Sequence, residues 1–329
     1  MSLESEMISL RNEVEYPVRT PVLAIAGLGR SGSTVIEAAL GAGQRGVVLG
    51  EVMHIWERSI QRNELCGCGR PFHECPFWGE VGERAFGGWD RVDAPRLAAE
   101  RAEIDRVVHI PRMGTRLGRG AFRFALKEYS WHYEQIYAAA VATSGADYVI
   151  DSSKQPSLVH ALATSPRLDV RVLHIVRDPR AVAYAWTKVV ARPEARDEES
   201  AYMTRYTPAQ TARHWMVHNL AVEGLRARNL PIERVRYEDF VADPVGTTAR
   251  LRAFAGEPHT DSEAVTAESI EVTGTQHSCS GNPMRLRGGP LVIRADEKWR
   301  TALPARDARL VSALTAPLSL RYGYDLGAS

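Results

Sequence analysis

The feature that most constrains the fold is a glycine-rich turn that follows a short apolar segment near the start of the chain. Residues Val22–Ala26 are all apolar, which is typical of a strand buried on both faces of a parallel sheet. The next residues, 27–34, read GLGRSGST, and residues 35–40 have the composition of a helix. Strand, glycine-rich turn and helix form the first half of a βαβ unit, which requires a parallel sheet with helices packed on it.

Four further apolar runs have the length of buried strands, and each ends at polar or charged residues. They cover residues 47–49, 148–150, 170–176 and 232–235. Helical stretches lie between them, at residues 121–143 and 209–228 among others. Strands that alternate with helices predict an α/β fold of three layers, a mostly parallel sheet flanked by helices, with a phosphate-loop-like turn after the first strand.

The 329 residues are predicted to form a single domain. We expect an N-terminal arm at residues 1–20, a cap or insertion at residues 52–120, where strand patterns are rare, and a glycine- and arginine-rich loop at residues 274–289. No pattern in the chain predicts an oligomeric state.

Charge and hydropathy argue against several classes of partner and location. A net charge of +1 gives no reason to expect nucleic acid or an anionic membrane as a partner. The first twenty residues lack the pattern of a signal peptide, and no apolar stretch reaches the roughly 18 residues that span a bilayer. Three of the four cysteines lie in one short segment, which is not a disulfide framework, so a cytoplasmic location is predicted.

The turn after the first strand has the spacing of a nucleotide phosphate loop but lacks the Lys expected after Gly32. Backbone N–H groups of such a turn converge on an anion, and the helix N-terminus adds a favourable dipole. Arg30 supplies a permanent planar charge in place of the Lys. A tight turn that binds no ligand is the alternative. A Mg²⁺ site would need a carboxylate at another strand end; Asp151 is the one on offer, but the Ser-Ser-Lys after it favours a cationic site.

Several motifs together resemble those of sulfotransferases that use 3′-phosphoadenosine 5′-phosphosulfate (PAPS). Residues Arg30–Thr34 (RSGST) resemble the loop that binds the 5′-phosphosulfate, and Val172–Val182 (VLHIVRDPRAV) resembles the element that binds the 3′-phosphate. Residues 66–78, 236–244 and 281–285 resemble a bacterial branch of the family, related to tyrosylprotein and carbohydrate sulfotransferases. The likeness runs from about residue 20 to the C-terminus with its motifs in chain order.

This resemblance implies a metal-independent transfer of a sulfuryl group from PAPS, with 3′,5′-adenosine bisphosphate as the product. It implies that Arg30, Ser31, Gly32, Ser33 and Thr34 hold the 5′-phosphate. The catalytic base would be Glu51, which lies just beyond a predicted strand end, with His54 as the rival base. Arg30 and Lys154 would stabilise the sulfuryl oxygens and the leaving phosphate.

The 3′-phosphate site is expected around Arg177, which follows an apolar strand and precedes a helix start, where a ligand at the carboxyl end of the sheet would meet it. The resemblance adds Arg285 and Arg287 of the C-terminal loop. It also exposes a departure, because the family usually has a Ser where this chain has Ala185. Tyr184 or the arginines of the loop are the candidates to compensate.

The cysteine-rich segment offers a second kind of site. Cys66, Cys68, His73 and Cys75 are enough ligands for tetrahedral zinc, although their spacing is tighter than in paired zinc knuckles. Thiols packed in the core of the cap are the alternative.

We therefore predict a sulfotransferase that acts on a hydroxyl of a small-molecule, sugar or metabolite acceptor by in-line displacement at sulfur. Two alternatives remain open at this point. One is a nucleotide-dependent kinase of the phosphate-loop class, and the other is a nucleotide-binding scaffold without catalytic activity.

Overall fold

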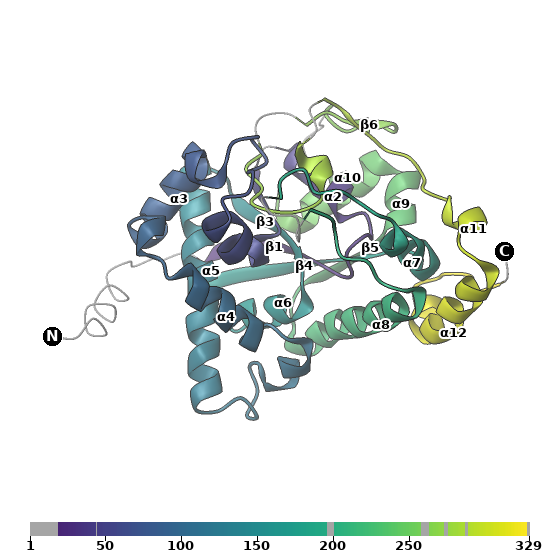
Figure 1. Cartoon of the computed structure of the whole chain (residues 1–329), viewed down its shortest axis with the longest axis horizontal. Coiled ribbons are helices and arrows are strands. Elements are labelled where there is room, and N and C mark those ends of the chain that lie inside the picture. Colours follow the sequence, from purple (N-terminus) through teal and green to yellow (C-terminus); the bar gives the residue numbers. More distant parts are fainter. Residues whose placement is uncertain are drawn as a thin grey trace.

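A five-stranded parallel sheet lies at the centre of the protein (Figure 1). The computed structural model describes residues 19–43, 45–195, 201–257, 263–272, 276–286 and 289–327. The strand order is β2-β3-β1-β4-β5. The strands are β1 (Thr20–Ala26), β2 (Gly46–Gly50), β3 (Tyr148–Lys154), β4 (Leu168–Val176) and β5 (Ile232–Arg236). All neighbouring pairs are parallel, so all five carboxyl ends lie along one edge of the sheet.

Helices cover both faces of the sheet, because the alternating side chains of β1 are apolar in both directions. Val22, Ala24 and Ala26 pack into one core, which includes residues of α5 (Ala121–Ser144) and α6 (Pro156–Leu162). Leu23 and Ile25 pack into the opposite core, together with residues of α2 (Ser33–Gly41) and α10 (Pro244–Ala255). The predicted three-layer α/β class is confirmed.

The remaining C-terminal helices pack beside β4 and β5. In Figure 1 α7 (Pro179–Thr187), α8 (Pro208–Gly224) and α12 (Ala305–Arg321) lie together, and they share the buried Trp215 and Leu318. The shorter elements are α9 (Tyr237–Ala242), α11 (Trp299–Ala302) and the antiparallel pair β6 (Ser269–Ile270) and β7 (Leu291–Val292).

The segment expected to form a cap folds into short helices, two of which, α3 (Pro76–Phe86) and α4 (Ala94–Ile104), pack against the long helix α5. It also contains a seven-residue π-helix at Ile55–Gln61. Its large aromatic side chains, Trp56 and Trp78 among them, are buried in the core rather than presented to a ligand. Most of the arm predicted at residues 1–20 lies outside the described residues. Among the helices of the described ranges, none has the length and apolar character to cross a membrane.

A glycine at the end of β1 allows the phosphate-loop-like turn to pass close to β4. Gly27 has φ of 138°, and a Cβ there would lie 2.3 Å from the backbone oxygen of Ile175. We therefore expect Gly27→Ala to lower the free energy of unfolding by about 3 kcal/mol or more, measured by urea denaturation.

A matched control separates this collision from backbone strain alone. Gly145, at the end of α5, also has a positive φ of 70°, but a Cβ there would meet nothing within 4 Å. Gly145→Ala should therefore cost only about 1 kcal/mol. Equal losses for the two variants would contradict the close approach of the turn to β4.

Candidate active site

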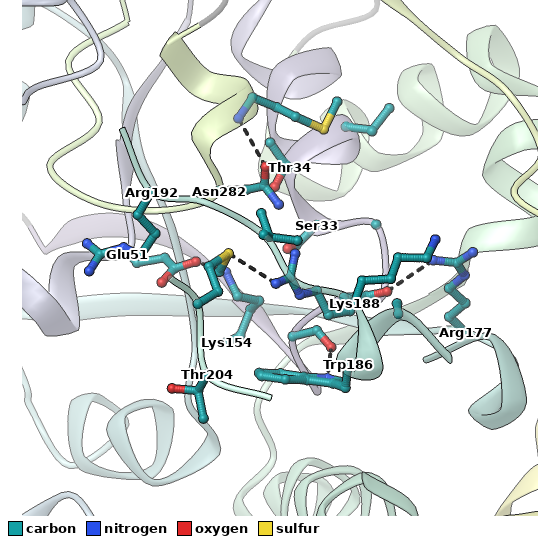
Figure 2. Close-up of a pocket in the computed structure, with 18 of the residues that line it drawn as sticks. Ser33, Thr34, Glu51, Lys154, Arg177, Trp186, Lys188, Arg192, Thr204 and Asn282 are labelled. Atoms are coloured by element: carbon teal, nitrogen blue, oxygen red, sulfur yellow. Dashed lines mark hydrogen bonds and ion pairs between the residues drawn. The ribbon is translucent and has the colours of Figure 1, made fainter. Parts of the chain in front are cut away.

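The strand order assembles residues that are far apart in the sequence along the carboxyl edge of the sheet. Glu51 follows β2, Lys154 ends β3, the turn at residues 27–32 follows β1, and Arg177 follows β4. Because the order is β2-β3-β1-β4, these groups lie in that same order in space. They line one cavity of about 780 Å³, which is within the usual range for a ligand site (Figure 2).

The lining of this cavity is strongly basic. Its cationic residues are Arg30, Arg58, Arg62, Lys154, Arg177, Lys188, Arg192 and Arg294, and its acidic residues are Glu51, Glu57 and Asp296. A concave surface with this excess of positive charge concentrates anions. The sequence had pointed to three of the eight cations, Arg30, Lys154 and Arg177.

The turn between β1 and α2 has the conformation of an anion cradle. Gly32 has φ of 91°, and a Cβ there would lie 2.3 Å from the ring of Tyr237. The first N–H groups of a helix lack intrahelical acceptors, and Gly32, at the N-cap of α2, has no side chain to cap them. Ser33 and Thr34 line the cavity, so these N–H donors are available to an anion there. Ser31, by contrast, is buried and does not line the cavity.

Arg30 sits in this turn in a conformation that L-residues rarely adopt, with φ of 71°. Its guanidinium lies over the ring of Trp186, 5.5 Å from the centroid. The indole Nε1 of Trp186 donates a hydrogen bond of 3.0 Å to the carbonyl of Gly29. Trp186 therefore fixes both the backbone of the turn and its arginine, a role that the sequence did not reveal (Figure 2).

Glu51 and Lys154 form a half-buried ion pair at the β2–β3 side of the cavity. Lys154 Nζ lies 2.6 Å from Glu51 Oε1 and also donates to the carbonyl of Ser152 at 2.8 Å. Burial alone would raise the pKa of Glu51, but the neighbouring positive charges, that of Lys154 above all, outweigh it and lower the pKa to about 2. Lys154 has φ of 64°, so its backbone, like that of Arg30, is held in the left-handed region.

His54 is placed beside Glu51, with its Nε2 3.6 Å from Glu51 Oε2. Burial, then the charge of Arg58, lowers the pKa of His54 well below its usual value. The imidazole is therefore neutral near pH 7, and it lies beside the carboxylate of Glu51.

At the other end of the cavity Arg177 is nearly buried and is aimed along the sheet edge. It donates to the carbonyl of Arg30 at 3.2 Å and lies 3.3 Å from Asp296 Oδ2, with its guanidinium over the ring of Tyr237. Lys188 Nζ is 3.7 Å from the same carboxylate oxygen. Arg177 and Lys188 thus form a second cationic pole, separated by the turn from Glu51 and Lys154 (Figure 2).

Of the two arginines expected in the C-terminal loop, Arg285 does not occupy the expected position. Arg285 donates to the backbone carbonyls of Ser278 and Leu65 at 2.9 and 2.8 Å, and it does not line the cavity. Arg287 lies outside the described residues. The tail arginine that lines the cavity is Arg294, which no motif had singled out.

Ala185 lines the cavity, as the position of the family's Ser suggested, and Lys188 lines it one turn further on. The ring of Tyr184, proposed as a substitute, instead lies 4.4 Å below the ammonium of Lys188 and is not part of the lining. Lys188 is therefore the cation closest in sequence to the missing hydroxyl.

Asp151 is not placed to bind a metal in the cavity. It is 2% exposed and accepts hydrogen bonds from Ser153 and from the hydroxyl of Tyr137. These hydrogen bonds give Asp151 a structural role, since they hold the last residues of β3, which end at Lys154. Asp151 also does not line the cavity.

In the cysteine cluster the structure corrects one ligand. His73 Nε2 lies 2.8 Å from the carbonyl oxygen of Ile60, and His73 is not among the side chains that cluster with the cysteines. The imidazole that lies with Cys66, Cys68 and Cys75 belongs to His277, from the C-terminal part of the chain.

Fold and site together define the class: an α/β protein with a phosphate-loop-like turn and a basic cavity at the carboxyl edge of a parallel sheet. The statistical description of the sulfotransferase family matches residues 21–261. The chain therefore belongs to the sulfotransferase family, and the predicted family is confirmed. Its assignment to a bacterial branch stays a prediction.

Individual relatives agree with this membership. Carbohydrate sulfotransferase 3 from Mus musculus is 28% identical over an alignment of 193 residues that covers 53% of this chain and 38% of that protein. The Homo sapiens protein of the same name is 31% identical over an alignment of 189 residues that covers 53% of this chain and 37% of that protein. The matched region therefore spans well under half the length of these curated relatives.

Solved structures of low sequence identity share the fold. The sulfotransferase domain from the curacin biosynthetic pathway has a TM-score of 0.54 at 15% identity, covering 94% of this chain and 99% of that chain. The sulfotransferase domain of the Synechococcus PCC 7002 olefin synthase has a TM-score of 0.50 at 19% identity, covering 94% and 97%.

Proposed function

We propose that this protein transfers the sulfuryl group of PAPS to a hydroxyl of a carbohydrate or another small-molecule acceptor. The observation that carries the proposal is that Glu51, Lys154, Arg177 and the turn after β1 meet in one basic cavity. A donor with phosphate at two positions and a transferable sulfuryl group needs separate anion sites, and the cavity has cationic poles on both sides of the turn.

The donor is proposed to lie with its 5′-phosphosulfate on the turn. The N–H groups at the start of α2, together with Arg30, would hold the 5′-phosphate. The 3′-phosphate would compete with Asp296 for Arg177 and Lys188, which already face one another across that carboxylate.

The ion pair between Glu51 and Lys154 is proposed to be the resting state of the free enzyme. With a pKa of about 2, Glu51 is always ionised but is a weak base. When Lys154 turns from Glu51 to the bridging oxygen of the donor, burial dominates and the basicity of Glu51 rises. The acceptor oxygen then bonds to sulfur as the bond from sulfur to the phosphate oxygen breaks. The hydroxyl proton passes to Glu51, and adenosine bisphosphate leaves with the electron pair of the broken bond.

The acceptor side of the cavity is proposed to be formed by the segment after α7 and by the C-terminal loop. Tyr202, Thr204 and Tyr206 line the cavity from the first segment, and Asn282 and Met284 line it from the second. Hydroxyl, amide and aromatic groups are the usual partners of sugars and polar metabolites. The curated relatives are named as carbohydrate sulfotransferases, which supports a sugar hydroxyl as the first acceptor to test.

The direct test is transfer of radiolabelled sulfate from PAPS into a panel of sugar and small-molecule hydroxyls, with and without EDTA. We expect transfer that EDTA does not abolish. Turnover of ATP that depends on Mg²⁺, without sulfuryl transfer, would instead support a kinase. Tight binding of adenosine bisphosphate without turnover of any acceptor would support a scaffold.

The charge of Lys154 makes the pH profile a specific test of the ion pair. A base must be deprotonated, so kcat/KM falls on the acid side as pH drops through the pKa of Glu51 in the free enzyme. With that pKa at about 2, the wild type should show no acid limb from Glu51 between about pH 5 and 8. In Lys154→Met the largest lowering influence is gone and burial raises the pKa, so an acid limb should appear in this range.

Lys188→Met is the matched control, because it removes the other lysine of the cavity without touching Glu51. It should leave the acid limb where the wild type has it. An acid limb at the same pH in all three proteins would contradict the proposed coupling of Glu51 and Lys154.

A further inference from the structure

Outside the cavity, four metal-binding side chains converge from two distant parts of the sequence. One ligand atom each from Cys66, Cys68, Cys75 and His277 lies within 4.8 Å of all the others. Cys68 Sγ is 3.7 Å from Cys75 Sγ, and His277 Nδ1 is 3.2 Å from Cys75 Sγ and 3.8 Å from Cys66 Sγ. Cys66 and Cys75 are buried, and the other two residues are half-buried.

The distances of 3.7 Å between the sulfurs of Cys68 and Cys75 and of 3.2 and 3.8 Å from His277 Nδ1 to Cys75 and Cys66 are close to the edges of a zinc tetrahedron. Zn–S bonds of about 2.3 Å and Zn–N bonds of about 2.0–2.1 Å place two sulfurs about 3.8 Å apart and a sulfur and a nitrogen about 3.6 Å apart. A disulfide would bring two sulfurs to about 2.05 Å. All the described cysteines are free. The spacing therefore fits thiolates that share a metal ion better than thiols that pair with one another.

We propose that Cys66, Cys68, Cys75 and His277 bind one structural Zn²⁺ ion. Three soft sulfur ligands and an imidazole in a tetrahedral arrangement favour zinc over the hard cations Mg²⁺ and Ca²⁺. Four protein ligands fill the coordination sphere, so the ion has no open position for catalysis. Binding releases the protons of the three thiols, so affinity falls as pH is lowered.

Surrounding backbone and ring contacts help to hold these ligands in place. The backbone N–H of Gly69 donates to the carbonyl of Cys66 at 2.9 Å, and that of Cys66 donates to Arg70, which closes a tight turn around the first two cysteines. The ring of His277 stacks on Phe77 at 4.8 Å. The carbonyl of His277 accepts a hydrogen bond of 2.7 Å from Trp78 Nε1. The stack and the hydrogen bond hold the ring and the backbone of His277 against the cap.

The proposed ion would connect the cap to the end of β2. The residues after His277 run along that strand: the backbone N–H of Cys279 donates to the carbonyl of Leu49 at 2.9 Å, and the backbone N–H of Glu51 donates to the carbonyl of Ser280 at 3.0 Å. The metal would thus fix the backbone of Glu51 from the side opposite Lys154. This consequence rests on the proposed role of Glu51, whereas the metal site itself does not.

The two histidines allow a matched test of the ligand set. The full chain, freed of any histidine tag and purified under reducing conditions without chelator, is analysed for metal by mass spectrometry. We expect about one zinc per chain in the wild type and in His73→Ala. In His277→Ala and Cys68→Ser we expect zinc affinity, measured by competition with a chelator, to fall by at least about 100-fold.

A second measurement on the wild type guards against variants that fail to fold. Titration of the thiols with a mercurial should release zinc stoichiometrically to a colorimetric chelator, and Co²⁺ in its place should give the intense visible bands of a tetrahedral thiolate site. Removal of zinc should also increase hydrogen exchange in peptides that contain residues 46–51 and 276–286.

The proposal is overturned if the reduced wild type neither contains zinc nor binds added zinc or cobalt. It is also overturned if His73→Ala loses the metal while His277→Ala keeps it, or if the freshly isolated protein holds a disulfide among these cysteines. Loss of sulfuryl transfer with zinc still bound would count against the proposed function and leave the metal site standing.

Discussion

Glu51→Gln is expected to lower kcat for sulfuryl transfer by about 10²- to 10⁴-fold. Glutamine keeps the shape of the side chain and an oxygen that can face Lys154, but its amide cannot accept the acceptor's proton at neutral pH. The affinity for adenosine bisphosphate, measured by calorimetry, should stay within about threefold, because Glu51 lies on the β2 side of the turn and Arg177 on the β4 side.

The matched comparison for Glu51→Gln is His54→Asn, which removes the rival base. His54 is neutral and lies 3.6 Å from Glu51, so its loss should cost less than about tenfold in kcat. A large loss for His54→Asn with a small one for Glu51→Gln would make the imidazole the base. Because removing one partner of a buried ion pair also destabilises a protein, thermal unfolding of both variants should be measured at the same pH.

Arg177→Ala is expected to raise the KM for PAPS and the Kd for adenosine bisphosphate by about 100-fold or more. A charge-assisted bond to a phosphate in a desolvated site contributes several kcal/mol. Arg177 is 6% exposed, and its guanidinium lies over the ring of Tyr237, 4.5 Å from the centroid, so it is already positioned for an anion. The loss of one of the two cations beside Asp296 would leave that carboxylate closer to the phosphate site and add to the effect.

Arg171→Ala is the control for this variant. Arg171 lies on the same strand, β4, but toward its amino end, where it donates to the carbonyl of Phe254 at 2.8 Å. It should leave donor affinity unchanged. Adenosine 5′-monophosphate, which lacks the 3′-phosphate, should bind to the wild type and to Arg177→Ala with the same affinity. Unchanged affinity for the bisphosphate in Arg177→Ala would overturn the assignment of Arg177.

The strands and the turn were predictable because their signals are local. A run such as Val22–Ala26 is apolar throughout because both faces of a central parallel strand are buried. Polar residues just beyond each run, Glu51, Lys154 and Arg177, must meet at one edge once the strands are parallel. The roles of these residues stay predictions, but their common location follows from the fold.

The geometry of the ion pair could not be predicted in this way. Glu51 and Lys154 are 103 residues apart, and only the adjacency of β2 and β3 brings Nζ to within 2.6 Å of the carboxylate. The pKa of Glu51 depends on that distance and on burial, neither of which a sequence pattern contains.

Contacts between distant parts of the chain were also not predictable for the C-terminal loop and for the cysteine cluster. The sequence predicted that Arg285 binds the donor and that His73 binds zinc with the cysteines, because each lies within or next to the motif concerned. In the structure Arg285 donates hydrogen bonds to two backbone carbonyls, and Arg294 lines the cavity. The structure pairs Cys75 with His277, 202 residues away, while His73 turns to Ile60.

The sequence by itself determined the α/β class, the glycine-rich turn after the first strand and the strand ends at which charged groups emerge, since each depends on residues within a few positions of one another. Only the tertiary structure decided which of these groups are neighbours: Trp186 under Arg30, Lys188 beside Arg177, and His277 among the cysteines. Strand order and the course of the tail set those contacts, and both result from packing across the whole chain rather than from any local preference.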